Sequence, residues 1–388
     1  MKKVWKILSY VLVAALASAL TLAVGSMGGT TAASGTVSKL DQLEALIEER
    51  FIGEVDTTAI EDAAAEAMVD SLGDRWSYYL SAEDYKSHKD TMANAYVGIG
   101  VTIQVPEDGA GFDIVKVTAG GPAEEAGLLA GDRMVAVDGV DIRDMDTTGT
   151  SALVKGEEGS TVDITVLRNG QELTLTVERR QVLVPVATGE MLADNVGLVR
   201  IENFDSRCAD ETIAAIEALL EQGAQALIFD VRYNPGGYAS ELVEVLDYLL
   251  PEGELFRTVD YAGKENVDYS DAACLDIPMA VLVNGDSYSA AEFFAAALME
   301  YEAATVVGEK TCGKGYFQYT YELKDGSAVG LSVGEYFTPN GKNLAGVGIT
   351  PDVEVAVDEE TAFAIYAGTL DPVEDPQIQA AIEALKGK

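Results

Sequence analysis

From about residue 183 onward, short apolar runs alternate with longer segments of helical periodicity, and this alternation constrains the fold more than any other feature. The runs VGLVRI, ALIFDVR, MAVLVNG and ATVVGEK have the length and composition of strands. Between them lie the helix-like segments DETIAAIEALLEQG, SELVEVLDYLL and SAAEFFAAALMEY. The pattern predicts an α/β core with glycine-rich turns at the strand ends, where functional sites of α/β sheets tend to lie.

Two different patterns precede this core, and one follows it. Residues 36–92 show apolar positions at three- and four-residue spacing, interrupted by LGDRW, so we expect helices, one of them opening at SAEDY. Residues 93–182 show short alternating runs separated by glycine, with one helical stretch, PAEEAGLL. That region predicts a mostly β domain. The core would then cover residues 183–356, and residues 357–388 would form a tail ending in an amphipathic helix.

Composition excludes several classes of function. The formal charge is −39, from 65 acidic and 26 basic residues, so nucleic acid is not expected as a partner. The three cysteines form neither a disulfide framework nor a zinc pattern, and we expect them to be small buried residues. The single histidine, His88, lies in a polar helix-like stretch and is expected at the surface. We predict no metal site and no cofactor, and a catalytic base other than histidine.

The N-terminus has the pattern of an export segment. Three lysines lie among the first six residues, and an uncharged, mostly apolar run follows from Ile7 to Val24. This run approaches the ~20 residues that span a bilayer, so we expect residues 1–35 to hold a single-pass membrane anchor and linker, with the protein body outside the cytoplasm. Secretion after cleavage of a signal peptide remains the alternative, because small residues at 29–35 could host the cleavage site.

Ser289 stands at the start of an apolar helix, and two interpretations are open for it. Glu292 follows three positions later, so Ser289 could simply cap the helix. The same position suits a nucleophile, because a helix N-terminus and the Ala290 N–H favour negative charge developing nearby. Ser287 is a rival nucleophile that lies outside the capping position.

A nucleophilic serine needs a base, and lysine is the usual substitute when no suitable histidine exists. A lysine with its ordinary pKa of about 10.4 is almost fully protonated at neutral pH, so only a buried lysine with a lowered pKa could accept the proton. Lys314, in CGKGYF, has small and mostly apolar neighbours that are compatible with burial.

The β region resembles a PDZ domain. The stretch GPAEEAGLLAGDRMVAVDG, from Gly121 to Gly139, is similar to the PDZ segment of bacterial proteases. PDZ domains capture the C-terminal carboxylate of a peptide in a glycine-containing loop and add the peptide as an extra strand. The resemblance implies that the peptide-binding residues lie in this loop: Val97, Gly98, Ile99 and Gly100.

Nearly the whole chain, from TVSKLDQLEALIEERFIGEVD onward, resembles the C-terminal processing peptidases, the tail-specific S41 serine peptidases. The segments LIFDVRYNPGGY, VLVNGDSYSAAE, VVGEKTCGKGYFQ, YFTPNGK and GVGITPDVEV occur in the order of that family. The family carries a serine/lysine dyad and a glutamine four residues after the lysine. The matching residues here are Ser289, Lys314 and Gln318, with the family's interval of 25 residues between serine and lysine.

The resemblance implies a mechanism and a fold. Lys314 would deprotonate Ser289, Gln318 would orient the pair, and the N–H groups of Ala290 and Gly236 would hold the oxyanion. The fold would be α/β, a crotonase/ClpP-like protease core with an inserted mostly-β PDZ domain and an N-terminal helical segment. Exported proteins with accessible C-termini would be the substrates, and the resemblance also suggests homo-oligomers.

The sequence departs from the family pattern at two places, and two other functions are weighed against the protease. SYSAAE replaces the family's usual SASASE, and Cys312 replaces a usual phenylalanine, which could loosen the packing around Lys314. A PDZ scaffold on a weak or inactive protease core is the alternative function. A trypsin-like protease is rejected, because His88 precedes the PDZ segment and cannot belong to such a catalytic domain.

Overall fold

The computed structural model describes residues 38–106, 109–118 and 120–386. They belong to two compact units, one ending at Met68 and the other beginning at Val69. The predicted membrane segment, residues 1–35, lies outside the described residues. Within the described ranges, no helix is both long enough and apolar enough to span a bilayer.

The helices that precede the β domain begin where the sequence provides caps. Ser38 accepts the Asp41 N–H in front of α2 (Lys39–Arg50), and α3 (Thr57–Asp70) follows it. Ser81 accepts the Asp84 N–H in front of α4 (Ala82–Met92), as SAEDY predicts. A short strand that the sequence did not predict, β1 (Tyr78–Leu80), lies between α3 and α4.

The region after α4 is mostly β, and its main sheet has the order β3-β4-β5-β7-β8. A separate pair, β2 with β9, closes the region, and β6 pairs with β5. The bounds are β2 Ala95–Gly98, β3 Val101–Gln104, β4 Phe112–Val117, α5 Pro122–Glu125, β5 Arg133–Val137, β6 Val140–Asp141, α6 Thr147–Val154, β7 Thr161–Arg168, β8 Gln171–Glu178 and β9 Arg180–Leu183. Only one helix was predicted here. The second, α6, was missed because its threonines and glycine are poor helix formers, and Asp146 starts it as an N-cap.

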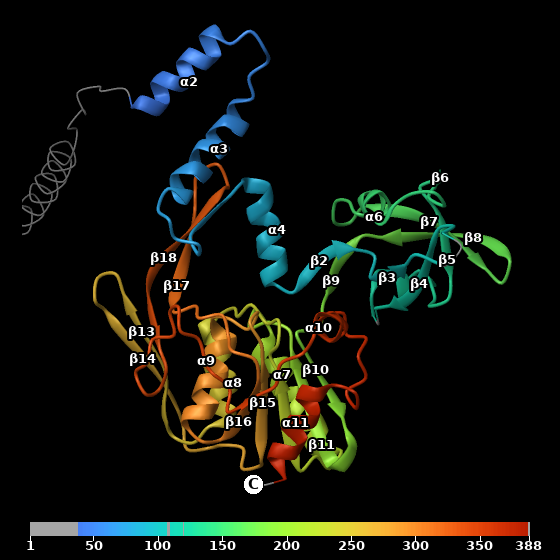
Figure 1. The fold of residues 1–388 in the computed structure, drawn as a ribbon. Helices are drawn as coiled ribbons and strands as arrows, with labels where there is room; N and C mark the ends of the chain where they lie inside the picture. The colour runs from blue at the N-terminus through green and yellow to red at the C-terminus, as the bar shows by residue number, and fades with distance from the viewer. Residues whose placement is uncertain (1–37, 107–108, 119, 387–388) are drawn as a thin grey trace, which may run out of the picture. The chain divides into compact units, whose positions relative to one another are not determined.

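The α/β core contains a six-stranded sheet with the order β10-β11-β12-β15-β16-β19, parallel except for β10 (Figure 1). The bounds are β10 Ala187–Met191, η1 Ala193–Asn195, β11 Val196–Ile201, α7 Cys208–Glu221, β12 Ala226–Asp230, α8 Ala239–Leu249, β15 Met279–Val283, α9 Ala290–Glu300, β16 Ala304–Gly308, β19 Val353–Glu354, α10 Glu359–Tyr366 and α11 Pro376–Leu385. The predicted strands, helices and final amphipathic helix are confirmed.

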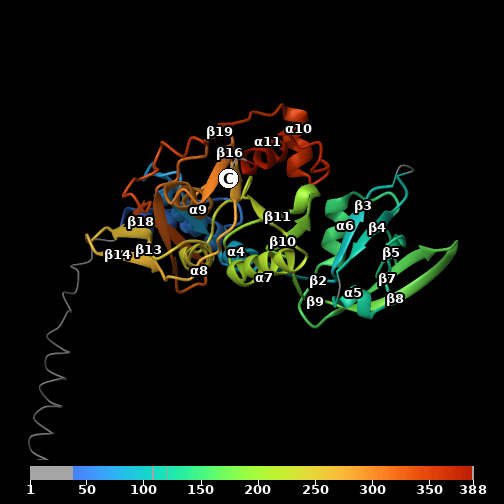
Figure 2. The ribbon, with the colours of Figure 1, turned by 90° about the horizontal axis from the view of Figure 1, so that it is seen from below.

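Both faces of this sheet are covered, which explains why its strands are continuously apolar. Leu227 and Phe229 of β12 pack in the cluster that includes α7, α8 and α9. Ile228, between them, points to the other face, where Ile378 and Leu385 of α11 pack. Figure 2 shows α7 and α8 on one side of the sheet and α11 on the other.

A second sheet joins segments that are far apart in the sequence. Its order is β1-β18-β13-β14, and β17 pairs with β18. The bounds are β13 Gly253–Asp260, β14 Glu265–Ser270, β17 Tyr316–Glu322 and β18 Ala328–Phe337. Because β1 pairs with β18 from Tyr78↔Gly330 to Leu80↔Ala328, the segment Tyr78–Leu80, which precedes the β domain, is part of the core's own structure.

Candidate active site

Ser289 lies on a sharp turn between β15 and α9. Its backbone has φ 58° and ψ −127°, a conformation that non-glycine residues rarely adopt, and the residue is only 4% exposed. Such strain costs on the order of 1–3 kcal/mol and persists only where the surroundings fix it. The nucleophilic serine of α/β-hydrolases also lies on a strained strand-to-helix turn.

The surroundings that fix this turn centre on Glu292, which is fully buried on the first turn of α9. One carboxylate oxygen accepts the N–H groups of Ser289 at 3.1 Å and Lys314 at 2.8 Å. The other accepts the Thr311 hydroxyl at 2.6 Å and the Gly313 N–H at 2.7 Å. Burial raises the pKa of Glu292, while these four donors lower it. One side chain therefore joins the serine turn to the lysine loop.

Lys314 presents its amine to aromatic rings. Its Nζ lies 4.7 Å from the ring centre of Trp76 and 5.9 Å from that of Tyr288. Burial lowers the pKa of Lys314 to about 8, against the opposing effects of Cys312, Asp74 and Glu292. A pKa near the working pH is what a general base requires.

Gln318, on β17, is linked to this site through another side chain. Its Nε2 donates to the Ser332 hydroxyl at 2.9 Å and to the Tyr316 carbonyl at 3.2 Å. Among the described residues it has no hydrogen bond to Ser289 or Lys314. Instead Tyr336 of β18 lies near the Ser289 side chain, which lowers the pKa of the Tyr336 hydroxyl against the larger, opposite effect of burial.

The two predicted oxyanion residues lie next to each other. A Cβ placed on Gly236 would come within 2.7 Å of the Ser289 Cβ and 2.9 Å of the Ala290 nitrogen. The Gly236 N–H donates to Asn234 Oδ1 at 2.8 Å, and the Tyr288 N–H donates to the Asn234 carbonyl at 3.2 Å. Buried Asn234 therefore clamps the glycine turn against the serine turn.

The structure also places Ser287, the alternative nucleophile, and His88, the single histidine. Ser287 is buried, and its hydroxyl donates to the Val231 carbonyl at 2.7 Å and accepts the Asn284 N–H at 3.0 Å, which stabilises the turn. His88 is partly exposed beside the Tyr78 ring, and burial lowers its pKa, so this residue is less solvated than the expected surface position implies.

The cysteines differ from one another. The expectation of three buried residues holds for Cys208 only, since Cys274 is exposed and Cys312 is half-buried beside the Arg75 guanidinium.

The predicted peptide-binding loop lines a cavity of about 120 Å³. Val97, Gly98, Ile99 and Gly100 form one end, and the rest comes mainly from β3 and from Ser151, Val154 and Lys155 at the end of α6. Because β3 is the edge strand of its sheet, its outer backbone groups are available to an added strand.

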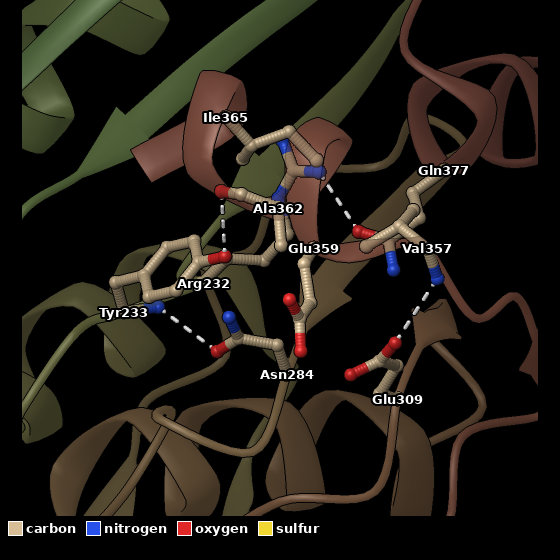
Figure 3. A pocket seen from close by; sticks show the side chains of 9 residues that line it. All are labelled: Arg232, Tyr233, Asn284, Glu309, Val357, Glu359, Ala362, Ile365 and Gln377. Atoms are coloured by element: carbon tan, nitrogen blue, oxygen red, sulfur yellow. Dashed lines mark hydrogen bonds between the residues drawn. The ribbon is translucent and has the colours of Figure 1, made fainter. Parts of the chain in front are cut away.

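A second cavity of about 120 Å³ is lined by Tyr233, by Asn284 and by Glu359, Ala362 and Ile365 of α10 (Figure 3). Tyr233 donates its N–H to Asn284 Oδ1 at 3.0 Å and its hydroxyl to the Ala362 carbonyl at 3.0 Å. Arg232 is ion-paired with Asp230 at 2.6 Å and Asp375 at 2.9 Å. These contacts fasten the C-terminal helices to the strand that leads into the NPGG turn.

Sequence reasoning missed several residues of this site. It identified Glu292 only as a partner in a cap and did not single out Trp76, Ser332 or Tyr336. LGDRW was interpreted only as a glycine stop between helices, and nothing local indicates that its tryptophan meets Lys314, which lies 238 positions later.

Comparison with known proteins gives a consistent result. The model of peptidase family S41 matches residues 195–355, and the PDZ domain model matches residues 97–178. The carboxy-terminal processing protease CtpA of Bacillus subtilis is 33% identical over 369 residues, covering 92% of this chain and 79% of that protein. The carboxyl-terminal-processing protease of Synechocystis is 34% identical over 334 residues, covering 84% and 76%.

A solved structure supports the fold. A structure from Bacteroides fragilis, described as an S41 protease, superposes on this chain with a TM-score of 0.55. The match covers 89% of this chain and 97% of that one, at 18% sequence identity. At that identity the similarity concerns the fold, and it agrees with the predicted α/β protease core carrying a PDZ domain and N-terminal helices.

The Glu292 carboxylate provides the first test of the site. In Glu292→Gln, one carboxylate oxygen becomes an N–H₂ group that faces at least one backbone N–H in either amide orientation, so the carboxylate that joins the serine turn to the lysine loop is weakened as an anchor. We expect kcat/KM to fall about 100-fold or more, since each hydrogen bond to a buried charge contributes about 1.5–3 kcal/mol. Glu302→Gln makes the same change at an exposed position just beyond the end of α9 and should keep activity within about threefold. Equal losses in the two variants would contradict the anchoring role.

The Gly236 contact provides a second test. In Gly236→Ala the new methyl group would collide with Ser289, and φ is +89°, so we expect a destabilisation of about 1–3 kcal/mol and at least a tenfold loss of activity. Gly285→Ala is the matched control, because its Cβ would meet nothing closer than the Lys310 carbonyl at 3.9 Å. Thermal unfolding and peptide hydrolysis measure both effects, and an active Gly236→Ala enzyme would contradict the tight contact.

Proposed function

Because the chain belongs to the carboxy-terminal processing proteases, a serine protease family grouped as peptidase family S41, we propose that it is an endopeptidase with Ser289 as nucleophile and Lys314 as base. The observation that carries this proposal is the Glu292 carboxylate, which holds the backbones of both residues at one point. The strained turn at Ser289 and the partly buried Lys314, whose pKa is lowered to about 8, support it independently.

Proton transfer starts the reaction. A neutral Lys314 accepts the proton of the Ser289 hydroxyl as the oxygen attacks the scissile carbonyl. The resulting ammonium then donates that proton to the leaving amine, which leaves an acyl-enzyme on Ser289. Water, deprotonated by the neutral lysine, hydrolyses the ester and regenerates the hydroxyl.

The oxyanion needs donors next to Ser289. The Ala290 N–H stands at the start of α9, where the helix favours negative charge. Gly236 would be the second donor, and its N–H would share its hydrogen between Asn234 Oδ1 and the oxyanion. Losing one such donor costs about 10²–10³ in rate.

Gln318 has an indirect part in this proposal. Its amide binds Ser332 on β18, and that strand also carries Tyr336, which lies near the Ser289 side chain. We expect Gln318 to set the position of the β17–β18 hairpin beside the dyad, and to contact the dyad directly only after a shift on substrate binding.

The PDZ region would select substrates by their tails. The edge strand β3, the loop Val97–Gly100 and the apolar cavity beside α6 together suit an extended peptide that ends in an apolar residue. Proteins or peptides with accessible C-termini are therefore the proposed substrates. We further propose that residues 1–35 anchor the chain in the membrane and leave the protease outside the cytoplasm, and homo-oligomers stay a prediction.

The pH dependence of cleavage tests the lysine. With a pKa of about 8, Lys314 is charged and inactive as a base below that pH, and neutral above it. We therefore expect kcat/KM on an unfolded model substrate to rise about tenfold per pH unit up to about pH 8 and then to level off.

Variants complete this test. Ser289→Ala and Lys314→Ala should be inactive at every pH, while Lys310→Ala, an exposed lysine on the same loop, should retain the wild-type profile. Lys314→Ala with wild-type activity would refute the base assignment. Ser289→Ala with wild-type activity would refute the nucleophile.

The tail-binding proposal has its own test. C-terminal amidation removes the charge that the Val97–Gly100 loop would bind, so KM should rise about tenfold with little change in kcat. Ser151→Glu places a carboxylate in the cavity and should mimic amidation, whereas Thr148→Glu, on an exposed position of the same helix, should not. Indifference to both changes would show that this groove does not read the tail.

A further inference from the structure

The loop of residues 74–77, ahead of the PDZ region, is fastened to the protease core. Asp74 accepts the Trp76 N–H at 3.2 Å and the Ser77 hydroxyl at 2.6 Å. The Ser332 N–H donates to the Ser77 hydroxyl at 3.1 Å, and β1 continues the attachment by pairing with β18. The loop is therefore held on the same strand that binds Gln318.

This attachment carries Trp76 into the site. Its ring centre lies 4.7 Å from the Lys314 amine and 5.8 Å from the ring centre of Tyr288, the residue before the nucleophile. The Arg75 guanidinium lies 4.1 Å from the Trp76 ring centre and donates to Cys312 Sγ at 3.4 Å. The indole thus has aromatic and cationic contacts that fix its orientation.

We propose that Trp76 is a positioning residue of the protease site, whose indole ring forms one wall around the Lys314 amine and keeps water from it. The inference rests on the proposed serine/lysine mechanism and adds to it a residue from outside the α/β core. It also explains how Cys312, a small residue, is compatible with a partly buried amine: the cover comes from the 74–77 loop.

Two effects of the ring oppose each other, and their sizes decide the outcome. A ring face near an ammonium favours the charged lysine by a factor of about two to five at an exposed site and by about thirtyfold when the pair is desolvated. Removal from water favours the neutral form by up to 3–5 pKa units at full burial. Burial is also the largest influence on the pKa of Lys314. The net effect of the ring is therefore to favour the neutral amine.

The other groups that face the amine shift the pKa of Lys314 in opposite directions. Asp74 on the loop, Glu292 on α9 and the Cys312 thiol raise the pKa of Lys314, and Arg75 lowers it. The Tyr288 hydroxyl stays neutral in the working range, because burial raises its pKa. None of these groups replaces the water-excluding surface of the indole, so its removal should expose the amine.

Trp76→Ala tests the proposal in the full-length protein. We expect the midpoint of the kcat/KM profile to move upward by about one pH unit or more, with about a tenfold loss at pH 7. At pH 10 the rate should return to within about threefold of wild type. Trp76→Phe keeps an aromatic wall and should leave the midpoint within about half a unit.

Controls separate this role from general damage. Tyr261→Ala removes an exposed aromatic ring from the β13–β14 turn and should change nothing. If Trp76→Ala fails to fold, Trp76→Gln replaces it, since the amide oxygen can solvate the ammonium and should also move the midpoint upward. Thermal unfolding of each variant identifies the folded ones.

Two results would overturn the proposal. One is an unchanged midpoint with activity lowered by the same factor at every pH, which is the behaviour of a purely structural residue. The other is a Trp76→Ala profile identical to wild type. Lys314→Ala, measured in parallel, distinguishes failure of this inference from failure of the dyad, because only the latter leaves that variant active.

Discussion

The site depends on one buried carboxylate that receives four hydrogen bonds. Glu292 holds the N–H groups of Ser289 and Lys314 on one oxygen and binds the Lys314 loop again through the other. A buried carboxylate is costly unless such donors surround it, so the donors and the carboxylate require each other. The strained serine turn persists because this network and the NPGG turn leave it no relaxed alternative.

In a chain of charge −39, the protonation state of Lys314 depends on the groups next to its amine more than on distant charges. The surplus of acidic residues would favour a protonated lysine, yet exposed charges beyond about 8–10 Å are largely screened by salt. The immediate surroundings of Lys314 therefore decide its protonation. They include two aromatic rings from separate parts of the chain and the charged side chains of Asp74, Arg75 and Glu292. The pKa of about 8 results mainly from burial.

The parts of the fold that were predicted correctly are those with strong local periodicity. The strands of the parallel sheet, the helices α7, α8 and α9, and the capped helix α4 all follow from apolar spacing and turn residues. The strand β1 and the helix α6 did not. Tyr78–Leu80 is a strand only because β18 lies beside it, and α6 depends on its Asp146 cap and its packing on the β domain.

The element order, the serine at a helix start and the glycine-flanked lysine can all be derived from the sequence alone, because they follow from residue type and spacing within short windows. The tertiary structure decided what surrounds them. It places the Trp76 ring near the Lys314 amine. It also pairs the Gln318 amide with the Ser332 hydroxyl, and the Gly236 N–H with Asn234 Oδ1. Such contacts arise from strand pairing and close packing between distant segments, and no local pattern encodes which side chains meet there.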